Sequence, residues 1–206
     1  PISGAVCYPR LKNRPGLQVG DMERIRYREP GSDELLDFTE TYVDADFADL
    51  GGDGGIDMVI GERNADHVTI LVDSGDRSPT GLPIFVRDRR VPVPVVDSGG
   101  HGYLSFSDVD GDGVPDLVSC GYWIRNRNPD GRPFEPDDPV DLEAGANVTF
   151  LDVDGDGRQE LIGYAKTESR WSDWPEEPGA YPGGTVTWRR RLPGNEVRFG
   201  PSLPVS

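Results

Sequence analysis

The segment FSDVDGDGVPDL, residues 106–117, recurs as FLDVDGDGRQEL at 150–161 and, with one departure, as FADLGGDGGIDM at 47–58. In each copy an Asp follows the first Phe by two residues, a Gly-Asp-Gly comes next, and an acid stands at the ninth position counted from that Asp. Such an internal repeat indicates a chain built from similar consecutive units, each organised around the same segment.

The middle copy has the composition of a calcium loop. Asp108, Asp110 and Asp112 stand at alternate positions. Gly111 and Gly113 let the backbone fold back, so that the three carboxylates face one point. Like charges at this spacing repel and raise one another's pKa, so the arrangement is stable when a divalent cation lies at its centre. Ligands that are all oxygen favour calcium over zinc or copper.

The rest of the coordination shell follows by analogy with the calcium loop of the EF-hand. In the middle copy the backbone carbonyl of Val114 is at position seven and Asp116 is at position nine. The residues that follow, LVSCGYW, lack the pattern of an amphipathic helix, which favours an EF-hand-type loop between two strands and disfavours a true EF-hand pair. The third copy supplies an equivalent set: Asp152, Asp154, Asp156, the Arg158 carbonyl and Glu160.

The first copy is incomplete. It offers Asp49, Asp53 and Asp57, but Gly51 stands where the second carboxylate is expected. A water or the Gly51 carbonyl would substitute there, so we expect a lower calcium affinity than in the other two loops. The alternative for all three segments is an acidic surface turn, because Asp and Gly are the commonest turn residues. The complete spacing of the second and third copies favours the metal.

These segments resemble the calcium-loop repeats called FG-GAP or VCBS, which occur in the propeller of integrin alpha subunits, in fungal propeller lectins and in secreted bacterial proteins. The resemblance covers the three loops and the strands around them, or most of residues 40–206. It implies that each repeat is one four-stranded blade of a β-propeller, with the metal loop between the first two strands. It does not fix an activity, because lectins, adhesion receptors and the propeller domains of lyases and dehydratases all carry such blades.

The composition agrees with an all-β fold. The 206 residues include 27 Gly and 19 Pro, which favour many turns and disfavour long helices. We expect a β-propeller of about four blades of four antiparallel strands, or a segment of a larger propeller, closed within one chain or completed by another copy or by other sequence. The expected units are a partial blade at 1–40 that ends in a strand-turn-strand, a blade with the degenerate loop at 41–98, and blades at 99–143 and 144–206.

The acidic charge excludes several classes of partner. The formal net charge is −16 at pH 7, and a field of this sign repels phosphates, so we expect neither a nucleic-acid partner nor an anionic membrane. The sequence has no apolar run long enough to cross a membrane and no signal peptide, so we expect no membrane insertion. Bound calcium ions would neutralise part of the acidity. The resemblance implies a secreted or extracellular protein.

Two cysteines are too few for a disulfide scaffold. Cys7 and Cys120 lie in similar apolar segments, AVCYP and VSCGYW, which predicts that they occupy equivalent strands of different blades. Cysteines on separate blades are too far apart to pair, so we expect two buried thiols.

The insertion KTESRWSDWPEEPGAYPGG, residues 166–184, is the predicted recognition surface. Trp171, Trp174 and Tyr181 stand there among Ser, Pro, Glu and Gly, and exposed aromatic rings commonly stack on sugars. The alternative is that these rings cap the open edge of the last blade. His101, in GGHGY, is placed to face the mouth of the propeller, although a lone His is more often a structural hydrogen-bonder than a catalyst.

No nucleophile and base, zinc pattern or phosphate loop can be identified in the sequence. We therefore expect a calcium-binding extracellular module for ligand recognition, with carbohydrate as the leading ligand class. A protein ligand, scaffolding or self-association are the alternatives within that class of function. The rival hypothesis is the propeller portion of a carbohydrate-active enzyme of the polysaccharide lyase or sugar dehydratase type.

Overall fold

A computed structural model describes residues 7–11, 19–38, 42–62, 66–94, 104–144, 147–166, 184–194 and 197–204. These residues form strands, turns and irregular segments and no helix, which confirms the all-β class. Among them there is accordingly no helix of the length and apolarity that crossing a membrane requires. The strands, in chain order, are β1 (Cys7–Leu11), β2 (Val19–Arg24), β3 (Arg26–Arg28), β4 (Leu36–Asp37), β5 (Tyr42–Ala48), β6 (Asp57–Glu62), β7 (His67–Arg77), β8 (Pro83–Pro92), β9 (Leu104–Ser107), β10 (Asp116–Ser119), β11 (Tyr122–Ile124), β12 (Val140–Asp141), β13 (Asn147–Leu151), β14 (Glu160–Lys166), β15 (Gly184–Arg189) and β16 (Leu203–Pro204).

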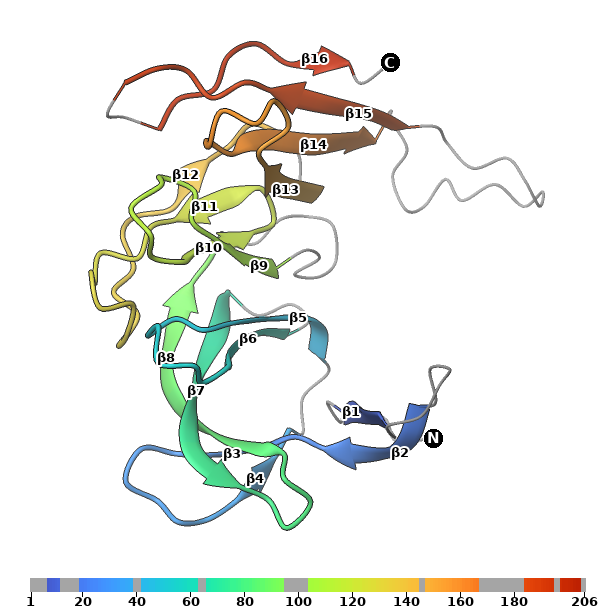
Figure 1. Ribbon diagram of the computed structural model, residues 1–206, viewed down its shortest axis with the longest axis vertical. Helices are drawn as coiled ribbons and strands as arrows, with labels where there is room; N and C mark the ends of the chain where they lie inside the picture. The colour runs from blue at the N-terminus through green and yellow to red at the C-terminus, as the bar shows by residue number, and fades with distance from the viewer. Residues whose placement is uncertain are drawn as a thin grey trace, which may run out of the picture.

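Three sheets follow one another along the long axis of the molecule (Figure 1). The first sheet has the order β4-β3-β8-β7-β6-β5, the second β12-β11-β10-β9 and the third β13-β14-β15-β16. Within each sheet the four strands of one repeat are neighbours in chain order, so each repeat is a meander of antiparallel strands. β1 and β2 form a separate two-stranded sheet.

The repeated segment forms the hairpin at one edge of each sheet. Its acidic loop joins β5 to β6, β9 to β10 and β13 to β14, which confirms that the loops lie between the first two strands of each unit. We call residues 49–56, 108–115 and 152–159 the first, second and third acidic loops. All three lie on the same side of the row of sheets, the left side of Figure 1.

The sheets pack face to face because alternate residues of a strand point to opposite faces. Leu117 and Val118, adjacent on β10, are both fully buried, and Leu117 lies in the core shared with the first sheet. Val118 lies in the core shared with the third sheet, together with Phe150 and Leu161. The second sheet is therefore apolar on both faces, as a sheet packed between two others must be.

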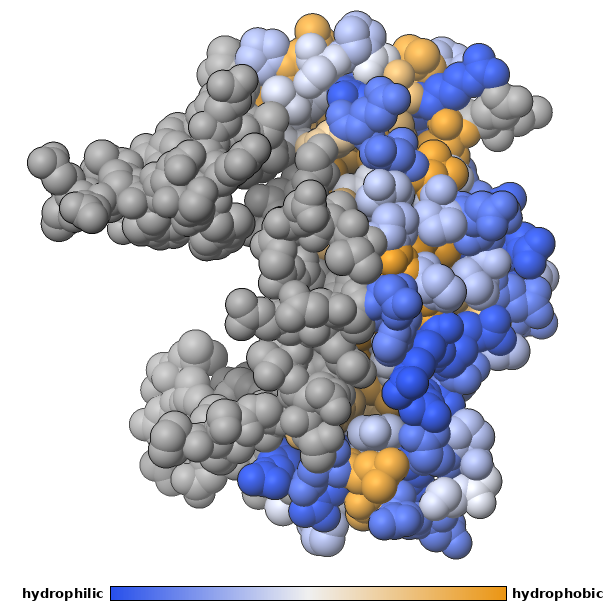
Figure 2. Space-filling view, turned by 180° about the vertical axis from the view of Figure 1, so that it is seen from behind, coloured by the Kyte–Doolittle hydropathy of each residue, from blue (hydrophilic) through white to orange (hydrophobic). Residues whose placement is uncertain are grey.

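The outer face of the third sheet has no such cover. Strand alternation places Leu151, Val186 and Leu203 on the side away from the second sheet, and they are 57%, 42% and 44% exposed. Ile162, which occupies the position of the fully buried Val118, is only half-buried on the same face. Seen from behind, apolar atoms lie at the surface at the top of the molecule, the end that the third sheet forms (Figure 2).

The expected strand-turn-strand of residues 23–40 is present as β3 and β4, which pair antiparallel. These strands belong to the same sheet as the next repeat, because β3 pairs in parallel with the start of β8 through Arg26 and Ile84. Ile25 and Phe38 beside them are buried in the same core as Met58, on the face of β6 that points away from the second sheet. Residues 26–37 thus extend the first sheet, where the sequence predicts the end of a separate blade.

One local prediction is wrong. Cys120 is a buried thiol, as expected, but it lies in the β10–β11 turn and not on a strand: Cys120 and Gly121 have φ of 51° and 86°, a two-residue turn that matches the twist of a hairpin. Cys7 does lie on a strand, β1. The last strand of the third sheet is Leu203–Pro204, and residues 197–201 contribute only the bridge between Arg191 and Phe199.

Candidate metal centres

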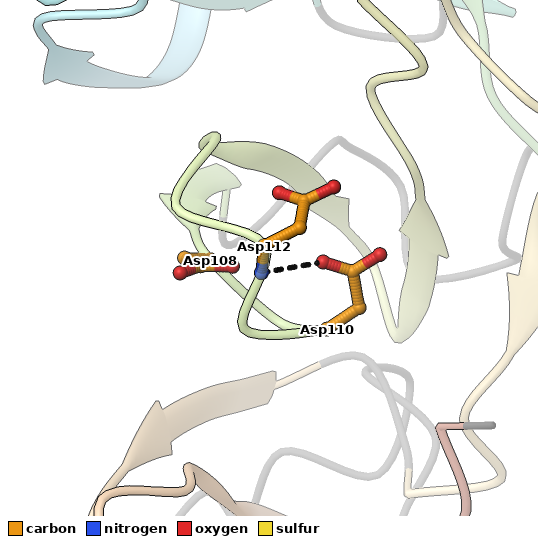
Figure 3. A group of neighbouring side chains, drawn as sticks. All are labelled: Asp108, Asp110 and Asp112. Carbon is orange, nitrogen blue, oxygen red and sulfur yellow. Dashed lines mark hydrogen bonds between the residues drawn. The ribbon is translucent and has the colours of Figure 1, made fainter. Parts of the chain in front are cut away.

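The second acidic loop brings its three alternate carboxylates together (Figure 3). One carboxylate oxygen from each of Asp108, Asp110 and Asp112 lies within 4.8 Å of the others. The fold-back that achieves this passes through Gly111 and Gly113, whose φ values of 78° and 89° are unfavourable for other residues. The predicted convergence on one point is therefore present in the geometry.

Backbone amides of the loop hold the carboxylates in place. Asp108 accepts hydrogen bonds from the amides of Gly111, at 2.8 Å, and Gly113, at 3.0 Å. Asp110 accepts from the amide of Asp112 at 3.1 Å, the bond drawn in Figure 3. Each oxygen keeps a second lone pair, so these bonds orient the carboxylates without using up their capacity to bind a cation.

The third acidic loop repeats this arrangement. Asp152, Asp154 and Asp156 also offer oxygens within 4.8 Å of one another. Asp152 accepts hydrogen bonds from the amides of Gly155, at 2.7 Å, and Gly157, at 3.0 Å. All three Asp residues are exposed, whereas Asp108 and Asp110 of the second loop are partly buried. The two loops therefore offer the same ligands at different depths.

The residues predicted to ligate through their carbonyls are in the corresponding positions of the two loops. The amide of Val114 donates to Asp112 at 2.9 Å, and the amide of Arg158 donates to Asp156 at 2.9 Å. These bonds fix the backbone directly after the third carboxylate. The ligand role of the two carbonyls stays a prediction.

Arginines contact the carboxylates of both loops. Arg125 lies 2.5 Å from Asp110 and 2.9 Å from Asp112, and Arg190 pairs with Asp154. Burial and the neighbouring carboxylates Asp112 and Asp108 raise the pKa of Asp110 against the lowering effect of Arg125. The hydrogen bond from Arg190 lowers the pKa of Asp154. The side chains of Arg125 and Arg190 are 44% and 60% exposed, so a cation that binds the loop can displace them into solvent.

The acid at the ninth position has a structural role that sequence reasoning missed. Asp57, Asp116 and Glu160 are all completely buried. Each accepts a hydrogen bond from the backbone amide that follows the first Asp of its own loop, and the donors are Leu50, Val109 and Val153. The ninth acid therefore ties the start of the loop to the second strand. Its repetition directly before an apolar residue in all three copies, Met58, Leu117 and Leu161, was the available signal.

Asp116 makes further bonds of this kind. Besides Val109 at 3.3 Å, it accepts from the amide of Asn126 at 2.8 Å and from Nε1 of Trp123 at 2.9 Å. Burial raises the pKa of Asp116 to about 6 against the lowering effect of these donors. Asp116 is outside the group of oxygens that lie within 4.8 Å, so in this geometry it contributes more to the loop's internal bonding than to the cluster.

Glu160 has one oxygen available. Its Oε2 accepts from the amide of Val153 at 2.8 Å, but its buried Oε1 has no hydrogen-bond partner among the described residues. A buried carboxylate oxygen without a partner costs free energy, and a cation would supply the missing interaction. The donor set of the third loop thus fits a divalent ion.

The first acidic loop differs from the other two. Asp49 accepts from the amides of Asp53 and Gly54, at 3.1 and 2.8 Å, as its counterparts do. Within the described part of the chain, however, converging groups of three acids occur only in the second and third loops. Arg132, from the connection between β11 and β12, pairs here with Asp53 and Asp57.

The residues predicted to bind a ligand, Trp171, Trp174, Tyr181 and His101, lie outside the described residues. Trp123 and Trp188 lie on β11 and β15, and both are half-buried. Trp123 packs against the core between the second and third sheets. Trp188 lies on the outer face of the third sheet, opposite Leu203.

Residues 108–163 match the family described as FG-GAP-like repeat, which confirms the resemblance over the second and third acidic loops and the strands between them. This repeat is typical of a β-propeller-type module. No curated protein and no solved structure matches the chain.

Proposed function

We propose that this chain is a calcium-binding module of the β-propeller type, in which the second and third acidic loops each hold one calcium ion. The observation that carries the proposal is the convergence of three carboxylate oxygens within 4.8 Å in each of these two loops. Both loops lie in the segment that matches an FG-GAP-like repeat. The unpartnered Oε1 of Glu160 is a further oxygen ligand for the third loop.

Calcium suits these loops better than the other common divalent ions. Carboxylates and backbone carbonyls are hard oxygen ligands, and calcium accepts them in six- to eightfold, flexible coordination. Magnesium requires near-octahedral geometry and keeps several waters, so it is bound less well by a loop with five protein ligands. A divalent ion also carries twice the charge of the guanidinium that it displaces.

The ion in the second loop couples metal binding to the packing of the sheets. Val109, between two of the ligands, is completely buried in the core between the second and third sheets, with Phe150 and Leu161. An ion held by Asp108 and Asp110 fixes the backbone on both sides of Val109. We infer that calcium in this loop stabilises the contact between neighbouring blades.

The residue equivalent to Val109 in the third loop bears on the exposed outer face of the third sheet. Val153 stands in the third loop where Val109 stands in the second, yet it is 52% exposed. It follows Leu151, an exposed apolar residue of the outer sheet face, by two positions in the chain. We propose that this face receives a further blade of a closed propeller, supplied by other sequence or by another copy of the chain.

Ligand recognition remains part of the proposal on the strength of the sequence. We propose carbohydrate as the ligand, with Trp171 and Trp174 as stacking platforms, and an extracellular location, where calcium in the millimolar range loads even weak loops. A glycan array with the wild type and a Trp171→Ala, Trp174→Ala variant tests this, and equal binding by both proteins would refute these residues as the platform. Turnover of polysaccharides or oxidised sugars, lost on replacement of His101, would favour the enzyme hypothesis instead.

Calorimetric titration with calcium tests the metal assignment. We expect two ions per chain in the wild type and one in each of the variants Asp110→Ala and Asp154→Ala. A chain that binds no calcium, and whose melting temperature is the same in calcium and in EDTA, would refute the proposal.

A further inference from the structure

Gly51 and Arg132 distinguish the first acidic loop from the other two. In the second and third loops the position of Gly51 is taken by Asp110 and Asp154, which belong to the converging carboxylates. Arg132 lies 79 residues beyond Asp53 in the chain, in the connection between β11 and β12 of the second sheet. The structure brings the two positions together.

The guanidinium of Arg132 contacts the carboxylates of the first loop. Its Nη2 pairs with Asp53, and its Nη1 lies 3.3 Å from Oδ1 of Asp57. Asp57 is completely buried, and the Arg132 side chain is only 25% exposed. A planar guanidinium has several donors in a fixed arrangement and suits two acceptors at once. The acids at positions five and nine of the loop are thus bridged by one cation.

Gly51 makes the space that Arg132 fills. A Cβ added at Gly51 would lie 2.4 Å from Nε of Arg132, well inside contact distance. The φ of Gly51 is not positive, so the backbone itself would accept an Asp, as it does at the equivalent positions. A side chain at position 51 therefore forces the guanidinium of Arg132 to move from its present place. The absence of a carboxylate at position 51 thus leaves the space in which the side chain of Arg132 lies.

The segment that carries Arg132 is fixed against the loop. A Cβ on Gly131 would lie 1.5 Å from the carbonyl oxygen of Leu50, so only glycine permits this approach. The carbonyl of Gly131 accepts from Nδ2 of Asn126 at 2.7 Å, and Nδ2 of Asn128 donates to the carbonyl of Pro133 at 2.8 Å. Arg132 is therefore held from both sides.

The arginines at the other loops differ in their position and contacts. Arg125 and Arg190 come from the same sheet as the loop they contact and are more exposed than Arg132. Arg191, which reaches the second loop from the third sheet, donates to the carbonyls of Val109 and Asp110 at 2.6 and 2.7 Å, and it has no bond to a carboxylate among the described residues. Of the described residues, Arg132 alone crosses between sheets to bind loop carboxylates.

We infer that Arg132 is the resident cation of the first acidic loop, which binds no calcium and ties the first sheet to the second without metal. The inference is the alternative to the expected weak calcium site at Asp49, Asp53 and Asp57, and the titrations below decide between the two. It rests on the proposed function only for the calcium content of the other two loops.

Ion stoichiometry provides the first test, with calcium alone as the probe in calorimetric titrations of the full chain. Asp53→Asn and Asp112→Asn change equivalent residues of the first and second loops. We expect two ions in the wild type, two in Asp53→Asn and one in Asp112→Asn. Three ions in the wild type, or the loss of one ion in Asp53→Asn, would overturn the inference. A wild type that binds no ion would refute the proposed function and leave the role of Arg132 to the second test.

Thermal unfolding in EDTA provides the second test. Arg132→Ala removes the cation and leaves a buried carboxylate without its charge partner, so we expect the melting temperature to fall by roughly 5 °C. The matched control Arg125→Ala removes an exposed arginine from the second loop and should shift it by less than about 2 °C. Arg132→Lys, which keeps the charge and loses the paired donors, should lie between, and it replaces Arg132→Ala if that variant does not fold. Equal melting of the wild type and both Arg132 variants would overturn the inference.

A gain of function completes the test. Gly51→Asp combined with Arg132→Ala restores the missing carboxylate and removes its competitor, so the double variant should bind three calcium ions. Gly51→Asp alone should still bind two, because the flexible Arg132 side chain shifts and still pairs with the loop carboxylates. A third ion in the single variant would show that Arg132 does not exclude calcium.

Discussion

Replacing Asp116 with Ala separates the structural role of the ninth acid from its role as a metal ligand. The carboxylate accepts hydrogen bonds from the amides of Val109 and Asn126 and from Nε1 of Trp123. If Asp116 serves the fold in this way, the variant is destabilised whether or not calcium is present. If Asp116 is only a calcium ligand, the variant and the wild type unfold alike once calcium has been removed.

The magnitude follows from the number of donors and from the buried charge. Leaving these three N–H groups, two of them buried and one partly buried, without an acceptor costs about 2 kcal/mol each, or about 6 kcal/mol together. Burial raises the pKa of Asp116 from 3.8 to about 6, so removing the charge at pH 7 offsets about 3 kcal/mol of that loss. We expect the free energy of unfolding at pH 7 to fall by about 3 kcal/mol, which lowers the melting temperature by about 9 °C in a chain of this length.

Urea and thermal unfolding of both proteins in EDTA measure this difference. Asp112→Ala is the control, because it removes an exposed acid of the same loop whose described hydrogen bonds are to Val114 and Arg125. We expect the control to lose a calcium ion and to change stability in EDTA by less than about 1 kcal/mol. An Asp116→Ala variant that matches the wild type in EDTA would refute the structural role.

Four further predictions follow from the same contacts. First, the folded state of calcium-free protein holds the proton of Asp116 more tightly than the unfolded chain does, because the pKa of Asp116 is raised to about 6. The stabilisation that comes from this proton is complete below pH 4 and is lost as pH rises through 6. In urea titrations in EDTA, the difference in unfolding free energy between wild type and Asp116→Ala should therefore narrow by about 3 kcal/mol from pH 4 to pH 7. Second, at calcium concentrations one hundred times the dissociation constant, two ions should stabilise the wild type by about 5 kcal/mol, and titration with EDTA should abolish the gain in melting temperature. Third, Leu117→Ala should cost about 3 kcal/mol with or without calcium, because the side chain is fully buried between the first and second sheets. Fourth, Val109→Ala should cost about 2 kcal/mol and Val153→Ala less than about 0.5 kcal/mol in urea unfolding, since the first side chain is fully buried and the second is 52% exposed.

The features that could be predicted from the sequence are those that the repeat encodes locally. The hairpins, the placement of each loop between two strands and the convergence of Asp108, Asp110 and Asp112 depend on residues within one segment of twelve. The spacing of Asp and Gly determines how such a loop turns back, so the three copies contain the information needed to predict the loop and its flanking strands.

Contacts between distant segments could not be predicted in this way. The pairing of Arg132 with Asp53 joins residues 79 apart, and the parallel pairing of β3 with β8 joins segments that differ in pattern. Nothing in the local sequence states which neighbour a strand edge or an arginine will meet. Gly51 could be recognised as a departure from the repeat, but the side chain that fills the space over it, Arg132, comes from the second sheet.

Short irregular elements also could not be predicted from the pattern of apolar and turn residues. The turn at Cys120 and Gly121 lacks the Asn-Gly or Asp-Gly signature of a two-residue hairpin loop, so the chain there reads as one continuous apolar strand. The two residues of β16 include a proline, which argues against a strand except at a sheet edge, where β16 lies.

The contact between Gly51 and Arg132 makes the number of ions that the chain can bind depend on two distant positions. A side chain added at position 51 would lie 2.4 Å from Nε of Arg132, so the guanidinium has to shift when a carboxylate appears there. On the inferred role of Arg132, a third ion requires both a carboxylate at position 51 and the loss of the arginine. Neither substitution is sufficient by itself.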